Sequence, residues 1–208
     1  MNEHTTFTSD PDVVDACELR FEIQAKYAAV ATEPEASYHF HTGRPIAERC
    51  RYDMAEVDAL PEIAVESFAG VANPFEFRTI QPGERVVDLG SGAGMDCFLA
   101  ARAAGSTGSV IGIDMTVAML DKARSTAAAM ELDNVDFHEG LIEELPVDDG
   151  WADAIISNGV INLAPDKEAV FAEIFRALKP GGVLQFADIA NGAPVPEDAR
   201  RQVDLWTG

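Results

Sequence analysis

The sequence has few basic residues for its length and lacks the segments that mark membrane and secreted proteins. Lys and Arg number 15 against 36 Asp and Glu, which gives a formal net charge of -21, and the basic residues form no cluster. A surface this negative repels polyanions, so we expect neither nucleic acid nor an anionic membrane as a partner. No apolar run approaches the roughly 20 residues that span a bilayer, and the N-terminus lacks the basic and apolar regions of a signal peptide. We therefore expect a cytoplasmic protein.

Cysteine is also scarce. Cys17, Cys50 and Cys97 are widely spaced and form no C-x-x-C pair, which argues against a disulfide scaffold and against a structural zinc site. The histidines show neither H-x-x-x-H nor a carboxylate-supported spacing. No metal site is therefore expected.

The length of 208 residues suits one α/β domain with a helical extension but is short for two full domains. Helical spacing of apolar residues begins at Asp12 and again near Pro45, and a third, short helix is predicted from Pro61 to Phe68. We interpret residues 1–75 as a helical extension that acts as a lid, and residues 76–208 as the main domain.

From Glu84 onward, short apolar runs alternate with helical segments, which is typical of βαβ units and a parallel sheet. The predicted strand cores are residues 85–88, 109–113, 135–138, 154–157 and 182–187. The predicted helices are residues 94–104, 116–131 and 166–178, and the last ends at Lys179-Pro180-Gly181-Gly182, where Pro and Gly turn the chain. Right-handed crossovers give a doubly wound, mainly parallel α/β sheet of Rossmann-like order 3-2-1-4-5.

The strongest chemical signal is Val87-Asp88-Leu89-Gly90-Ser91-Gly92-Ala93-Gly94, at the exit of the first predicted strand. Glycines there let a ligand approach the backbone. The spacing is G-x-G-x-G rather than the dinucleotide pattern G-x-G-x-x-G, whose pyrophosphate needs a helix N-terminus. S-adenosylmethionine (SAM) has no phosphate, and an acid near the loop suits its ammonium. The loop therefore favours SAM, with NAD or another ligand of a Rossmann-type turn as the alternative.

The ends of the later strands complete the predicted site. Asp114 ends the second strand, where a carboxylate can accept hydrogen bonds from both ribose hydroxyls. Leu141 and Ile142 follow the third strand, in the place expected for adenine, and Asn158 follows the fourth, bordering the reacting end. The predicted cofactor-binding residues are Asp88, Gly90, Ser91, Gly92, Asp114, Met115, Leu141, Ile142 and Asn158.

The block from about Glu84 to Ala187 resembles the class I SAM-dependent methyltransferases. Within it, Gly112-Ile113-Asp114-Met115-Thr116 and residues 157–167 resemble the arsenite methyltransferase branch. The resemblance implies SAM as the cofactor and transfer of its methyl group to a small-molecule acceptor by in-line displacement. Because the sulfonium is already activated, the protein contributes chiefly proximity, alignment and exclusion of water, and the chemistry requires no side-chain base.

The resemblance also implies that arsenite methyltransferases bind the metalloid through thiolates, which are soft ligands for a soft atom. Their motif Gly-Cys-Gly-Asn-Pro reads Gly70-Val71-Ala72-Asn73-Pro74 here, and Gly159 stands at the cysteine of their Ser-Asn-Cys-Val-Ile-Asn-Leu motif. We therefore do not expect arsenite as the acceptor. The alternative to catalysis is a regulator or regulatory subunit that binds SAM or a related adenosine ligand.

The C-terminal end bears on the sheet. This fold usually continues past the fifth strand with a helix and an antiparallel hairpin, which we do not find before Gly208. Because an exposed edge strand is ordinarily covered or paired, we expect a truncated or naturally abbreviated chain, or an edge that a partner subunit covers, as in a homodimer.

Three further groups have both a functional and a structural interpretation. Tyr38-His39-Phe40-His41 is either a lid whose histidine acts as a base or a set of aromatics that pack, and we favour packing. His138 is expected in a strand or in the wall of the pocket. The N-terminus of the helix after the glycine loop could lower the pKa of Cys97, but we favour a small residue packed between helix and sheet.

Overall fold

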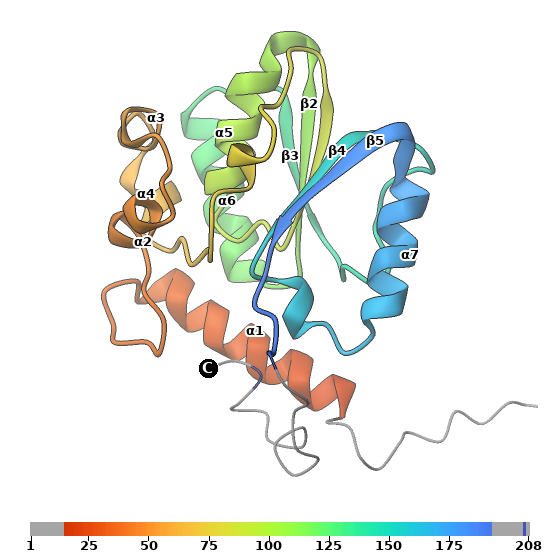
Figure 1. Ribbon diagram of the computed structural model, residues 1–208. Helices are drawn as coiled ribbons and strands as arrows, with labels where there is room; N and C mark the ends of the chain where they lie inside the picture. The colour runs from red at the N-terminus through yellow and green to blue at the C-terminus, as the bar shows by residue number, and fades with distance from the viewer. Residues whose placement is uncertain (1–14, 193–205, 207–208) are drawn as a thin grey trace, which may run out of the picture.

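A parallel sheet of five strands forms the centre of the part of the chain that the computed structural model describes, residues 15–192 and Trp206 (Figure 1). Its strand order, β3-β2-β1-β4-β5, is the predicted one. The strands are β1 (Arg85–Leu89), β2 (Ser109–Asp114), β3 (Val135–Glu139), β4 (Ala152–Asn158) and β5 (Leu178–Ala187). The central strand β1 is rich in apolar residues, and its side chains are buried in cores on both faces of the sheet.

Strand β5 begins four residues earlier than predicted. Leu178 pairs with Ala152, and Val183 pairs with Ala154. More residues of β5 than of β4 lie between these two pairs, so the register between the strands shifts there. Gly181 has a φ of 83°, a conformation that favours glycine. The predicted end of the preceding helix is confirmed, since α7 (Lys167–Ala177) ends directly before β5. Residues 179–182 are not a separate turn, however, because Pro and Gly here mark an irregularity inside β5.

Helices cover the two faces of the sheet and build two main cores. α5 (Met95–Ala104) and α6 (Val117–Ala129) pack on one face, where Phe98 and Phe137 meet edge to face with ring centroids 5.7 Å apart. α7 (Lys167–Ala177) packs on the other face, and the carboxylate of Asp166 caps its N-terminus by accepting from the Ala169 amide at 2.9 Å. Short 3-10 turns connect these elements at Pro74–Glu76, Gly105–Thr107 and Ile161–Leu163.

The segment before the sheet is helical, as predicted. α1 (Ala16–Thr32) begins after Asp15, whose side chain accepts from the amides of Cys17 and Glu18, while residues 12–14 of the predicted helix lie outside the described range. α2 (Arg44–Arg49) and α3 (Met54–Asp58) follow, and α4 (Glu62–Val65) is shorter than predicted. Among the described residues, no helix has the length and apolar character needed to cross a membrane.

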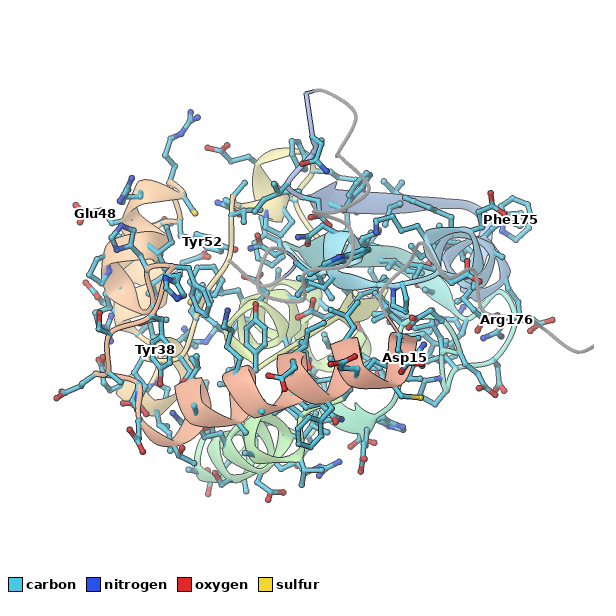
Figure 2. All side chains as sticks on the ribbon, turned by 90° about the horizontal axis from the view of Figure 1, so that it is seen from below. Asp15, Tyr38, Glu48, Tyr52, Phe175 and Arg176 are labelled. Carbon is cyan, nitrogen blue, oxygen red and sulfur yellow. The ribbon has the colours of Figure 1, made fainter. Side chains whose placement is uncertain are left out.

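Helix α1 lies beneath the sheet, across the carboxyl ends of the strands (Figure 1). Figure 2 shows it from below, with Asp15 at its N-terminal end and Tyr38 beyond its C-terminal end. The amide of Gln24 donates to the carbonyl of Met115 at 2.8 Å, which joins α1 to the end of β2. Lys122 of α6 donates to the Ala31 carbonyl at 3.0 Å and to the Ser67 hydroxyl at 2.7 Å. These bonds hold the N-terminal helices against the sheet.

Candidate functional site

The carboxyl ends of β1, β2, β3 and β4 surround an open cavity, and α1 closes one side of it with Arg20, Ile23 and Tyr27. The cavity has a volume of about 1030 Å³ when its open mouth is included, which is large enough for a small organic ligand. The structure brings all nine residues of the predicted site to the wall of this cavity: Asp88, Gly90, Ser91, Gly92, Asp114, Met115, Leu141, Ile142 and Asn158.

The glycine loop folds tightly between β1 and α5. Gly90 and Gly92 have φ values of 68° and 52°, which L-residues with side chains rarely adopt. A Cβ atom at Gly90 would also overlap the side chain of Val160, whereas one at Gly92 would meet no atom within 4 Å. The hydroxyl of Ser91 is buried and has no hydrogen-bond partner among the described residues. Because buried hydroxyls are ordinarily paired, this atom fits a polar ligand in the cavity.

Both carboxylate oxygens of Asp114 accept backbone hydrogen bonds, and one of these comes from the glycine loop. Its Oδ2 accepts from the Gly92 amide at 2.9 Å, and its Oδ1 accepts from the Thr116 amide at 2.7 Å. Burial raises the pKa of this carboxyl, while the amide hydrogen bonds act in the opposite direction. Each carboxylate oxygen has a second lone pair, so Asp114 can still accept hydrogen bonds from two neighbouring hydroxyls.

The loop after β3 forms the wall expected for adenine. Leu141 and Glu144 form an isolated antiparallel bridge, so this segment turns back on itself at the cavity. Glu143 accepts from Arg20 of α1 at 3.0 Å, which ties the loop to the helix below it. Arg20 is the basic residue of the lining, and this pairing offsets its charge.

Asp88 lies deeper, at the end of β1, with 3% of its surface exposed. Its Oδ2 accepts from the thiol of Cys97 at 3.2 Å. Burial, then the charges of Asp96 and Asp114, raise the pKa of Asp88 well above its ordinary value. Burial and Asp88 likewise raise the pKa of Cys97, so the alternative of a pKa lowered by the helix N-terminus is wrong. Cys97 is fully buried in the core between helix and sheet, as the favoured interpretation predicted.

Asn158 joins the sheet to the segment before it. Its Oδ1 accepts from the amides of Val71 at 2.8 Å and Ala72 at 3.2 Å, and its Nδ2 donates to the Ala72 carbonyl at 2.8 Å. Nδ2 also lies 2.9 Å from the hydroxyl of Tyr52 and 3.2 Å from Oδ2 of Asp96. Asn158 therefore borders the cavity as predicted, while its amide holds the loop at residues 71–72 in place.

Sequence reasoning missed Asp96 and Tyr52. Asp96 follows Gly94 by two residues and lines the cavity, and its Oδ1 accepts from Tyr52 Oη at 2.8 Å. Burial raises the pKa of Asp96 to about 6, although the hydrogen bonds from Tyr52 and Asn158 lower it. A second carboxylate directly after the glycine motif was the available signal for Asp96. No local pattern connects Tyr52 to it, because the two residues are 44 positions apart.

The aromatic patch takes the structural role that we favoured. The ring of Phe40 stacks on Tyr27 with centroids 5.9 Å apart and on Tyr38 at 5.8 Å. Residues 38–41 are not part of the described lining of the cavity, whereas Tyr27 of α1 is. His138 lies in β3 and its Nε2 pairs with Asp136 at 3.0 Å, away from the lining.

The donor set fits SAM better than a dinucleotide or a metal. The cavity combines apolar side chains, an unpartnered Ser91 hydroxyl, the Asp114 carboxylate and the two buried acidic side chains Asp88 and Asp96. A ligand with ribose hydroxyls at one end and positive charge at the other satisfies these groups. No group of three or more His, Cys, Asp or Glu side chains within the described ranges could hold a metal ion.

Comparison with known proteins gives a consistent result. The family described as "Methyltransferase domain" matches residues 80–207. The arsenite methyltransferase of Halobacterium salinarum is 38% identical over 100% of this chain and 56% of that relative, and the human arsenite methyltransferase is 31% identical over 91% and 52%. The chain therefore spans about half the length of these relatives.

A solved structure agrees with these relatives. The arsenic (III) S-adenosylmethionine methyltransferase from Chlamydomonas reinhardtii superposes with a TM-score of 0.65 at 38% identity, over 70% of this chain and 51% of that one. The chain thus belongs to the class I SAM-dependent methyltransferases, whose cofactor is SAM, and is related to the arsenite methyltransferases.

Proposed function

We propose that this chain transfers the methyl group of SAM to a small-molecule acceptor by in-line displacement. The observation that carries the proposal is the convergence of Asp114, the Gly90–Gly92 loop and Asn158 on one cavity. Asp114 holds the ribose, the glycines admit the methionine portion, and α1 limits the access of water. When bound, SAM supplies an already activated methyl group, so the protein's part is to align it with the acceptor.

The acceptor is a small molecule other than arsenite. Val71 and Gly159 occupy the cysteine positions of the two arsenite motifs, and a Cβ atom at Gly159 would lie 3.1 Å from Cγ1 of Val71. The two positions are therefore neighbours, and neither offers a thiol. Cys50 donates to the Gly70 carbonyl from a buried position outside the lining, and a single thiol makes a poor metalloid site.

The test of cofactor binding is isothermal titration calorimetry of the chain with SAM, S-adenosylhomocysteine (SAH) and NAD in parallel. We expect micromolar binding of SAM and SAH and none of NAD. Binding of NAD alone, or of none of the three, would overturn the proposal.

Turnover separates catalysis from binding. The chain is incubated with SAM and a pool of small metabolites, and SAH formation is measured with and without added arsenite. We expect SAH formation that arsenite does not increase. Tight SAM binding without SAH formation from any pool would favour the regulatory alternative, and arsenite-dependent SAH formation would contradict the assignment of the acceptor.

A further inference from the structure

Asp96 has a charge that the described contacts leave unbalanced. It lies in the first turn of α5 with 6% of its surface exposed, and it lines the cavity. Its two oxygens accept from Tyr52 and Asn158, and both of these donors are neutral groups. Hydrogen bonds from neutral groups hold a carboxylate in place but leave its charge available to a ligand.

The described neighbours of Asp96 do not offset its charge. Asp88 is buried beside it, and the charge of Asp96 is one cause of the raised pKa of Asp88. Arg20 is the one basic residue in the described lining, and it pairs with Glu143 on the loop after β3. Among the described residues, the end of the cavity marked by Asn158 and the glycine loop therefore presents the Asp96 carboxylate without a basic partner.

SAM and SAH differ only at the sulfur, which joins the methionine portion to the ribose. They share adenosine, ammonium and carboxylate groups, but SAM carries a methyl group and a positive charge on sulfur. In methyl transfer, an acceptor lone pair forms a bond to the methyl carbon, and the electron pair of the breaking C–S bond passes to sulfur. The sulfonium thereby becomes a neutral thioether, so any interaction with a nearby carboxylate weakens in the product.

We propose that Asp96 is the residue by which this cavity discriminates the cationic donor SAM from the neutral product SAH. This inference rests on the proposed function, and it gives the buried Tyr52–Asp96–Asn158 group a role in product release. The unpartnered Ser91 hydroxyl in the same cavity independently indicates a polar ligand there.

The decisive experiment compares two variants that both disturb the Tyr52–Asp96 hydrogen bond and differ in charge. Asp96→Asn removes the charge with little change of shape, whereas Tyr52→Phe removes a hydrogen bond to Asp96 and keeps the charge. Calorimetry at pH 7.5 gives the Kd of SAM and of SAH for the wild type and both variants. SAH, being neutral at sulfur, serves as the internal control for damage to the site.

We expect Asp96→Asn to lower the SAM preference, the Kd of SAH divided by that of SAM, by about tenfold. Tyr52→Phe is expected to leave this ratio within about twofold of the wild type. An unchanged ratio in Asp96→Asn, or an equal fall in both variants, overturns the inference while SAM binding itself stands. Failure of both ligands to bind the wild type overturns the proposed function and this inference together.

A second measurement covers the case in which Asp96→Asn does not fold. The sulfonium does not titrate, and the ligands' ammonium groups stay largely protonated below pH 7, so the wild-type ratio measured from pH 7 to pH 5 reports chiefly on groups of the protein. Facing Asp96 are Tyr52 and Cys50 from the N-terminal segment, Cys97 of α5, Asp88 of β1 and the uncharged Asn158 of β4. Burial raises the pKa of Tyr52, Cys50 and Cys97, so these stay neutral throughout.

The pKa of Asp96 is about 6, so its charge is mostly present at pH 7 and mostly lost at pH 5, and Asp88 titrates in the same direction. We expect the SAM preference to fall as the pH falls. A ratio that stays flat across this range overturns the inference.

Discussion

At the scale of single residues, Asp114 has the most direct predicted effect on cofactor affinity. Its carboxylate lines the cavity and bonds the Gly92 amide, so Asp114→Ala removes the proposed ribose acceptor and loosens the glycine loop. We expect SAM affinity to fall by about tenfold to a hundredfold, as for lost hydrogen bonds to a charged group. Asp121→Ala, an exposed site on α6, is the matched control in charge. Undiminished affinity by calorimetry in Asp114→Ala would refute the ribose assignment.

The buried carboxyl of Asp96 makes a second residue-scale prediction, for the stability of the ligand-free protein. Its pKa of about 6 in the folded state lies above that of an exposed Asp. Protonation of Asp96 therefore stabilises the folded state at low pH, and this stabilisation is lost as the pH rises through 6. The stability of Asp96→Asn relative to wild type should therefore be higher at pH 7.5 than at pH 5. Urea denaturation at both pH values measures this difference.

The control for that measurement is Asp121→Asn, whose side chain is 70% exposed and whose relative stability should change little between the two pH values. A relative stability of Asp96→Asn that is constant with pH would mean that Asp96 titrates as an exposed carboxyl.

Residues of the site were predictable where chain position alone fixes them. Asp88, Gly90 and Asp114 sit at the ends of adjacent parallel strands, and such ends meet at one edge of the sheet. Tyr52 and Asp96 could not be predicted in this way, because their contact depends on how α2 and α3 fold back against α5. The unpaired Ser91 hydroxyl likewise becomes visible only when burial is known.

At the scale of elements, α7 and the segment before β4 depend on Arg176. Its guanidinium donates to the carbonyls of Val147 at 2.8 Å and Leu145 at 3.0 Å, and to Glu173 at 2.7 Å. Arg176→Ala leaves these acceptors unpaired, so we expect the free energy of unfolding to fall by about 1–3 kcal/mol. Arg49→Ala, an exposed site on α2, should change it by less than about 0.5 kcal/mol. Equal effects of the two substitutions in denaturant titrations would contradict this role.

Elements were predictable to the extent that local patterning governs them. The cores of all five strands were predicted within the observed bounds, because buried parallel strands appear as short runs of Val and Ile. The start of β5 was not, since the pairing of Leu178 with Ala152 across an irregularity overrides the local turn tendency of Pro180 and Gly181.

At the scale of the whole molecule, the net charge of -21 causes electrostatic repulsion in every compact conformation of the chain. At most 15 of the 36 acids can have a basic side chain of their own, so most carboxylates repel one another across the surface. Folding concentrates this repulsion, which destabilises the folded state relative to the expanded chain. Added salt shortens the screening length from about 10 Å at 0.1 M to about 3 Å at 1 M. Salt should therefore stabilise this protein.

We expect the midpoint of thermal unfolding to rise steadily between 0.05 and 1 M NaCl. KCl at equal ionic strength should produce the same rise, because screening depends on ionic strength and not on a specific cation site. Salt also weakens attractive pairs such as Lys122–Glu66, so the sign of the change decides which effect is larger. A midpoint that falls with salt would mean that a few partly buried ion pairs outweigh the repulsion of the whole acidic surface. The lysine bridge between α4 and α6 would then be the first pair to test by substitution.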